Sequence, residues 1–203
     1  MDKRWVIKPK PTADAAQNLA TQLGVSCIIA ELLIQRGVHD FEEAKKFFRP
    51  NLEHLHNPFL MQDMHLAVQR IEQAIQNNEN ILVYGDYDVD GTTAVALMFT
   101  FLKSIHSKVA YYIPDRYTEG YGISYQGIDF ARDNNFTLII ALDCGIKAND
   151  KITYANLKNI DFIICDHHRP GDELPAAIAV LDPKRTDCNY PFKELSGLSL
   201  IHI

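Results

Sequence analysis

The chain has 203 residues, of which 47% are hydrophobic, 23% charged and 10% aromatic. This is the length and composition of a globular protein with one large or two small domains, and it excludes wholesale disorder. The formal net charge of −6 argues against binding nucleic acid by broad electrostatics, so that such a role depends on a local patch or on bound cations. Four cysteines without a Cys-x-x-Cys pair predict scattered reduced thiols rather than a disulfide scaffold. No apolar run approaches the roughly 20 residues of a membrane span, and residues 1–5 show no secretory signal, so we expect a cytoplasmic protein.

Apolar residues recur at helical spacing from residue 12 to about residue 77, which predicts an α-helical N-terminal region over 1–78. Two helices are separated at Gly24, a third occupies 41–48 after the N-cap candidate Asp40, and a fourth occupies 64–75. The segment 51–62 is irregular. Its histidines, together with His65, are interpreted as surface residues because no rigid spacing supports a metal cluster.

Short apolar runs alternate with helical stretches from residue 81 onward. The expected strands are 81–84, 109–113, 138–142, 162–165 and 178–181, and the expected helices between them are 92–103, 124–134 and 149–157. Continuous apolar strands separated by helices are typical of a parallel sheet covered on both faces. We therefore predict an α/β domain over 79–203, with a Rossmann-like, mostly parallel five-stranded sheet and helices on both faces.

Chelating side chains follow three of these strands. They are Asp86, Asp88 and Asp90 after the first run, Asp143 after the third, and Asp166, His167 and His168 after the fourth. Taken singly, each group is as well explained by a turn, a helix cap or a surface histidine. Together they meet at the carboxyl edge of one sheet, where so many acids would repel one another without cations. Carboxylates with a little imidazole suit Mn²⁺ or Mg²⁺ better than a structural zinc, and a carboxylate between two such ions is a recurring device for hydrolysis at phosphorus.

The strings VYGDYDVDGTT (83–93), ALDCG (141–145) and DHH (166–168) resemble, in order and spacing, motifs I to III of the DHH phosphoesterase superfamily. The further strings IPDRYTEGYG (113–122), DPKR (182–185) and YPFKELSG (190–197) resemble the RecJ family of single-stranded-DNA-specific exonucleases within it. The resemblance covers residues 5–197. It implies a hydrolase that removes nucleotides from single-stranded DNA in the 5′-to-3′ direction, in DNA repair and recombination, with two Mn²⁺ or Mg²⁺ ions and with single-strand-binding or repair proteins as partners.

The resemblance also implies roles for individual residues. Asp88 and Asp90 match ligands of one ion each, Asp143 matches the bridging carboxylate, and Asp86 matches a further acid of motif I. One of His167 and His168 is expected to be a metal ligand and the other to lie near the scissile phosphate.

Three neighbours of these residues are interpreted separately. Tyr84 stands where other branches carry a histidine ligand and is not assigned to metal, and Asp166 is expected to orient a histidine. Arg116 is the candidate phosphate contact, and an ion pair with Asp115 or Glu119 is an equally good interpretation of it.

The sequence departs from the family pattern after residue 197. The fourth-motif aspartate, a second cleft domain and an OB-fold do not follow, so we expect a truncated form that binds Mn²⁺ weakly and cleaves single-stranded DNA poorly. A nanoRNA or cyclic-dinucleotide phosphodiesterase, a pyrophosphatase of the same superfamily and an inactive metal-binding remnant stay open as alternatives. A more distant one is a haloacid-dehalogenase-like phosphatase with Asp88 as nucleophile, because residues 88–92 read Asp-x-Asp-Gly-Thr.

Overall fold

The computed structural model describes residues 4–203. The chain divides into two compact units, one that extends to Leu55 and one that begins at His56. The predicted boundary at residue 78 does not coincide with this division, since the fourth helix packs within the second unit. As a boundary between functional domains it stays a prediction.

The first unit is helical, as its apolar spacing indicates. It contains α1 (Ala13–Leu23), α2 (Cys27–Ile34), α3 (Phe41–Phe48) and the 3₁₀ turn η1 (Leu52–His54). Gly24 ends α1 in the left-handed conformation, at φ 67°, and the Asp40 side chain caps α3 by accepting from the Glu43 N–H. Among the helices of residues 4–203, none is by itself long and apolar enough to span a membrane. The α1–α2 pair has the length and composition for it, but the two helices are bent by 109°.

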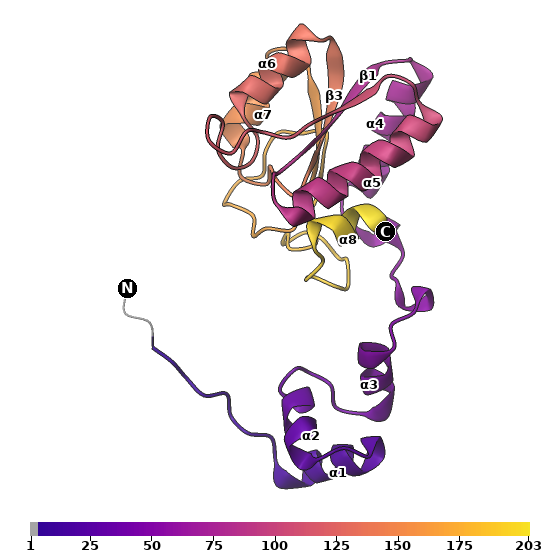
Figure 1. Ribbon diagram of the computed structural model, residues 1–203, viewed down its shortest axis with the longest axis vertical. Helices are drawn as coiled ribbons and strands as arrows, with labels where there is room; N and C mark the ends of the chain where they lie inside the picture. The colour runs from indigo at the N-terminus through magenta and orange to yellow at the C-terminus, as the bar shows by residue number, and fades with distance from the viewer. Residues whose placement is uncertain (1–3) are drawn as a thin grey trace. The chain divides into compact units, whose positions relative to one another are not determined.

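The second unit begins with the 3₁₀ turn η2 (Pro58–Leu60) and continues as an α/β domain (Figure 1). Its remaining elements in chain order are α4 (Met64–Gln76), β1 (Asn80–Gly85), α5 (Val89–Ile105), β2 (Val109–Tyr112), α6 (Tyr125–Asp133), β3 (Phe136–Leu142), α7 (Asn149–Asn156), β4 (Asp161–Cys165), β5 (Ala179–Leu181) and α8 (Gly197–His202). The five strands form one parallel sheet in the order β2-β1-β3-β4-β5. The predicted fold class is confirmed.

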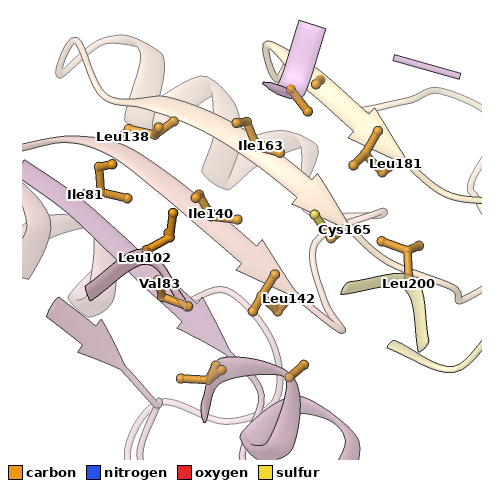
Figure 2. Close-up of a cluster of buried hydrophobic side chains, with 14 of the residues drawn as sticks. Ile81, Val83, Leu102, Leu138, Ile140, Leu142, Ile163, Cys165, Leu181 and Leu200 are labelled. Atoms are coloured by element: carbon orange, nitrogen blue, oxygen red, sulfur yellow. The ribbon is translucent and has the colours of Figure 1, made fainter. Parts of the chain in front are cut away.

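Alternate strand residues enter two separate cores, as expected for a sheet buried on both faces. One core, drawn in Figure 2, packs Ile81, Ile140 and Ile163 against α4, α5 and α8. The other packs Leu82 and Ile139 against α6 and α7. The chain passes from β1 to β2 on one side and then to β3 on the other, so the strand order reverses at β1. In open α/β sheets this places a ligand crevice at the carboxyl ends of β1 and β3.

The predicted strands and long helices are present with end shifts of a few residues. The short elements η1, η2 and α8 were not predicted. Within residues 4–203, neither the histidines of the irregular segment nor His65 belongs to a group that could hold a metal ion. His54 accepts a hydrogen bond from the Asn51 N–H, and the His65 ring packs against Phe59, tilted by 30°, with ring centroids 4.7 Å apart.

Candidate metal centre

Four neighbouring strands each end one residue before an aspartate, and the four ends are in register. Gly85 pairs with Leu142, Leu142 with Cys165, and Cys165 with Leu181. The residues that follow these ends are Asp86, Asp143, Asp166 and Asp182, and each is at most 1% exposed. Parallel pairing therefore gathers four buried carboxyl groups at one edge of the sheet. Sequence reasoning placed the first three at this edge and missed Asp182, although it follows an apolar run in the same way.

Asp143 lies at the centre of this edge, in an environment that is energetically unfavourable for an ionised carboxyl group. Its backbone is left-handed, at φ 61°, and its Oδ1 is buried without a hydrogen-bond partner. Burial, and then the negative charges of Asp90 and Asp88, raise the pKa of the Asp143 carboxyl to about 7. A buried carboxyl group with a free oxygen and acidic neighbours is what a cation would stabilise.

Two imidazoles meet this carboxylate. Donor atoms of Asp143, His167 and His168 all lie within 4.8 Å of one another. The Nε2 atom of His167 lies 3.0 Å from Asp143 Oδ1 and 3.6 Å from Asp90 Oδ2. The His167–Asp143 contact has the distance of a hydrogen bond without its geometry, since Oδ1 has no hydrogen-bond partner. The structure thus brings Asp90, Asp143, His167 and His168 together, as the sequence predicts.

The loop from β1 into α5 carries the remaining acids. Asp88 is the N-cap of α5, and its Oδ1 accepts from the Gly91 N–H at 3.0 Å. A Cβ at Gly91 would lie only 2.6 Å from the Asp86 carbonyl oxygen, so glycine is required for this tight approach. The Oδ1 atom of Asp86 accepts from the Tyr87 N–H, whereas its buried Oδ2 has no partner, and burial raises the pKa of this carboxyl.

Asp166 orients His168 rather than facing the centre. Its Oδ1 lies 2.7 Å from His168 Nδ1 and its Oδ2 accepts from the Ile146 N–H. The hydrogen bond between the His168 and Asp166 side chains is the main cause that raises the pKa of His168. Burial alone would raise the pKa of Asp166, but the hydrogen bonds from His168 and Ile146 outweigh it and lower that pKa. With Nδ1 engaged, Nε2 is the ring nitrogen of His168 left for chemistry, and the expected orienting contact of Asp166 is confirmed.

The other singled-out residues are also placed. Arg116 is exposed, and its guanidinium lies 4.5 Å from the centroid of the Tyr87 ring. Neither of its alternative ion pairs, with Asp115 or Glu119, is found in the described chain. The hydroxyl of buried Tyr84 donates to the Gly122 carbonyl and accepts from the Ser124 N–H, which is a structural role.

The donor set fits a hard divalent cation. Buried carboxyl oxygens without a hydrogen-bond partner belong to Asp86, Asp143 and Asp182. The group that could hold a metal ion combines the Asp143 carboxylate with the imidazoles of His167 and His168. Carboxylate oxygen with some imidazole suits Mn²⁺ and Mg²⁺. The free cysteines near this edge, Cys144 and Cys165, are buried, and burial raises the pKa of each thiol, which disfavours the thiolate that zinc requires.

Comparison with known proteins identifies the family. The sequence model of the DHH family, N-terminal domain, matches residues 80–202. The chain belongs to the DHH family. Among curated proteins, it is 41% identical to the single-stranded-DNA-specific exonuclease RecJ of Bacillus subtilis (strain 168) over 97% of this chain and 25% of that protein. It is 33% identical to RecJ of Escherichia coli (strain K12) over 85% of this chain and 30% of that protein.

Solved structures give the same result for the fold. A structure of exonuclease RecJ bound to manganese superposes with a TM-score of 0.64 at 27% identity, over 72% of this chain and 37% of that one. RecJ from Thermus thermophilus in complex with Mn²⁺ superposes with a TM-score of 0.70 at 23% identity, over 98% of this chain and 27% of that one. The chain therefore spans between about a quarter and just over a third of the length of these relatives.

Proposed function

We propose that this DHH-family site hydrolyses phosphodiester bonds of single-stranded DNA with two Mn²⁺ or Mg²⁺ ions. The observation that carries the proposal is the convergence of Asp143 with His167, His168 and Asp90 at the carboxyl ends of β1, β3 and β4. The named relatives are exonucleases specific for single-stranded DNA, and one was solved with manganese. These relatives support single-stranded DNA as the substrate class and manganese as a metal of the site.

The roles that we propose combine the family resemblance with these contacts. Asp143 would bridge two ions, with Asp88 and Asp90 on one ion each and His167 as a further ligand. Two such ions lower the pKa of a water molecule and neutralise charge on the phosphoryl oxygens. His168 is fixed by Asp166 and about half exposed, and it would use Nε2 to hold a proton for the leaving oxygen. Asp86 contributes negative charge beside these ligands.

Arg116 is proposed as a phosphate contact of the same site. Its guanidinium has no ion pair in the described chain and lies over the ring of Tyr87, one residue before Asp88. A guanidinium without an ion pair keeps its planar fork of N–H groups available to phosphate oxygens. The proposal includes a cellular role in DNA repair and recombination and partner proteins that bind single strands, as the resemblance implies, and a cytoplasmic location, as expected from the sequence.

Two alternative functions are separated from the proposal in different ways, one by the structure and one by experiment. A haloacid-dehalogenase-like reaction needs a nucleophilic aspartate directly after the first strand, whereas Asp88 follows β1 by three residues and caps α5. A nanoRNA or cyclic-dinucleotide phosphodiesterase would use the same ligands, so substrate comparison separates it from the proposal.

The test compares the chain with Asp143→Asn. Mn²⁺ binding is measured by calorimetry, and hydrolysis is measured on a 5′-labelled single-stranded oligonucleotide and on bis(p-nitrophenyl) phosphate. We expect Mn²⁺ to bind weakly, both substrates to be cleaved slowly and only with metal, and the variant to lose this cleavage by at least about 100-fold, because removing a bridging charge affects both ions.

Duplex DNA, a short RNA and a cyclic dinucleotide serve as substrate controls. Absence of Mn²⁺ binding by the unmodified chain, or cleavage that is equal in Asp143→Asn, would contradict the proposed reaction. Faster cleavage of the RNA or the cyclic dinucleotide would keep the reaction and replace the substrate.

A further inference from the structure

We infer that the first turn of α8 is a positioning element of the metal centre, in which the backbone N–H groups of Gly197 and Leu198 fix the carboxylate of Asp90. This inference rests on the proposed function, since it assigns a role toward the metal that the function requires.

The contact joins segments more than 100 residues apart in sequence. The Gly197 N–H donates to Asp90 Oδ2 at 2.8 Å, and the Leu198 N–H donates to Asp90 Oδ1 at 2.7 Å. These lengths are typical of hydrogen bonds to an ionised acceptor. Two bonds from consecutive amides fix both the position and the rotation of one carboxylate, and each oxygen keeps a lone-pair direction free.

Glycine at position 197 allows this approach. A Cβ there would meet the Asp143 side chain at 2.7 Å from Oδ1 and at 2.8 Å from both Cβ and Cγ. Separations under 3.0 Å between such atoms require displacement, and Asp143 is buried and has little room to move. The α8 backbone therefore lies against Asp143 and bonds to Asp90 at the same time.

The contact is not needed to cap α8. The N-cap is Ser196, whose Oγ already accepts from the Ser199 N–H at 3.1 Å. The first-turn amides of a helix have no partner inside it, so Gly197 and Leu198 have free donors to offer. They offer them to a carboxylate whose Oδ2 is 3.6 Å from the candidate ligand nitrogen of His167.

Groups that orient a metal ligand from behind affect affinity without touching the ion. Loss of such a partner typically lowers metal affinity by about 10- to 100-fold. The amides of α8 hold Asp90 in the orientation in which its Oδ2 lies 3.6 Å from His167 Nε2. The expected result of losing one of them is weaker metal binding in a protein that remains folded.

The test compares Leu198→Pro with Leu198→Ala. Both variants lack the leucine side chain, but only proline removes the N–H, and proline is tolerated in the first turn of a helix. We expect Mn²⁺ affinity, measured by calorimetry with the metal alone, to be at least about 10-fold lower in Leu198→Pro than in Leu198→Ala. Urea unfolding in EDTA is measured in parallel. A purely structural role of the Leu198 N–H predicts that Leu198→Pro loses stability while the two variants bind Mn²⁺ with equal affinity.

A second pair of variants covers the case in which the proline variant does not fold. Gly197→Ala adds a methyl group against Asp143, whereas Gly171→Ala adds one at a position whose nearest atoms are 3.7 and 3.9 Å away. We expect Gly197→Ala to weaken Mn²⁺ binding by about 10-fold or more and Gly171→Ala to leave it unchanged.

The outcomes separate the two proposals. If the unmodified chain binds Mn²⁺ and neither pair shows an affinity gap, the role of α8 is wrong and the proposed function stands. If the unmodified chain does not bind Mn²⁺ at all, the proposed function is wrong and the role of α8 falls with it.

Discussion

Asp143 carries several local costs at one position. Its left-handed backbone, at φ 61°, is uncommon for a residue with a Cβ, and its buried Oδ1 has no hydrogen-bond partner. Backbone strain of this kind typically costs about 1–3 kcal/mol and gathers at functional positions. A cation beside Oδ1 would offset the electrostatic part of this cost, which is why the site is better explained by metal binding than by helix capping.

The hydrogen bond between Asp166 and His168 can be tested by replacing Asp166. In Asp166→Asn we expect the pKa of His168 to fall, because the hydrogen bond from Asp166 is the main cause that raises it. The ring also loses its fixed orientation, so Mn²⁺ affinity or cleavage should fall by about 10- to 100-fold. Imidazole NMR titration in metal-free buffer measures the pKa, and calorimetry measures the affinity.

The matched control is Asp172→Asn, which neutralises an exposed acid close in sequence to His168. An equal fall of the His168 pKa in both variants would show that general charge, rather than the 2.7 Å contact, sets it.

At the scale of elements, one buried arginine ties the start of α4 to the end of β5. The Arg185 guanidinium pairs with Asp63 and Asp187 and donates to the Val180 carbonyl, and its side chain is 7% exposed. In Arg185→Ala we expect the free energy of unfolding to fall by about 3–5 kcal/mol, because Asp63 and a strand carbonyl lose a buried charged partner. Urea unfolding followed by far-UV circular dichroism measures it.

Arg132 provides the comparison, since it also contacts two carboxylates but is 46% exposed. Arg132→Ala should cost at most about 1 kcal/mol. Similar losses in both variants would mean that the Arg185 cluster is no stronger than a surface pair.

Prediction from sequence succeeded where a local pattern repeats. Strands β1, β3 and β4 are continuous apolar runs, and α1 ends at a glycine with positive φ, so each has its own signal. The six residues of α8 are too few to show a helical period, and their role depends on Asp90, which lies more than 100 residues earlier in the chain. Asp182 follows a predicted apolar run, as the other acids do, but that run is the shortest strand, β5, and its register with β4 shows that Asp182 extends the row of acids.

At the scale of the whole molecule, the row of buried acids should make stability depend on pH. Burial is the main cause that raises the pKa of both Asp143 and Asp182 to about 7. An unfolded chain titrates its aspartates near pH 3.9. Between about pH 4 and 7 the folded protein therefore holds protons that the unfolded chain has lost, and stability falls as pH rises through this window. His168 contributes with the same sign at higher pH, because its folded-state pKa is also raised.

We expect the metal-free protein to lose about 5 kcal/mol of unfolding free energy between pH 5 and 7.5, about 2.5 kcal/mol for each of the two carboxyl groups, and Mn²⁺ to restore most of it at pH 7.5 but little at pH 5. The reason for the difference is that a metal binds the ionised carboxylates, so protons compete with it at low pH. Urea unfolding at several pH values, in EDTA and in excess Mn²⁺, measures both effects. The variant Asp143→Asn/Asp182→Asn replaces two of the titrating groups by amides, and it should show a much shallower profile in EDTA and little response to Mn²⁺. A profile in the unmodified chain that rises with pH, or that is identical with and without Mn²⁺ at pH 7.5, would show that these carboxyl groups neither retain protons nor receive a cation.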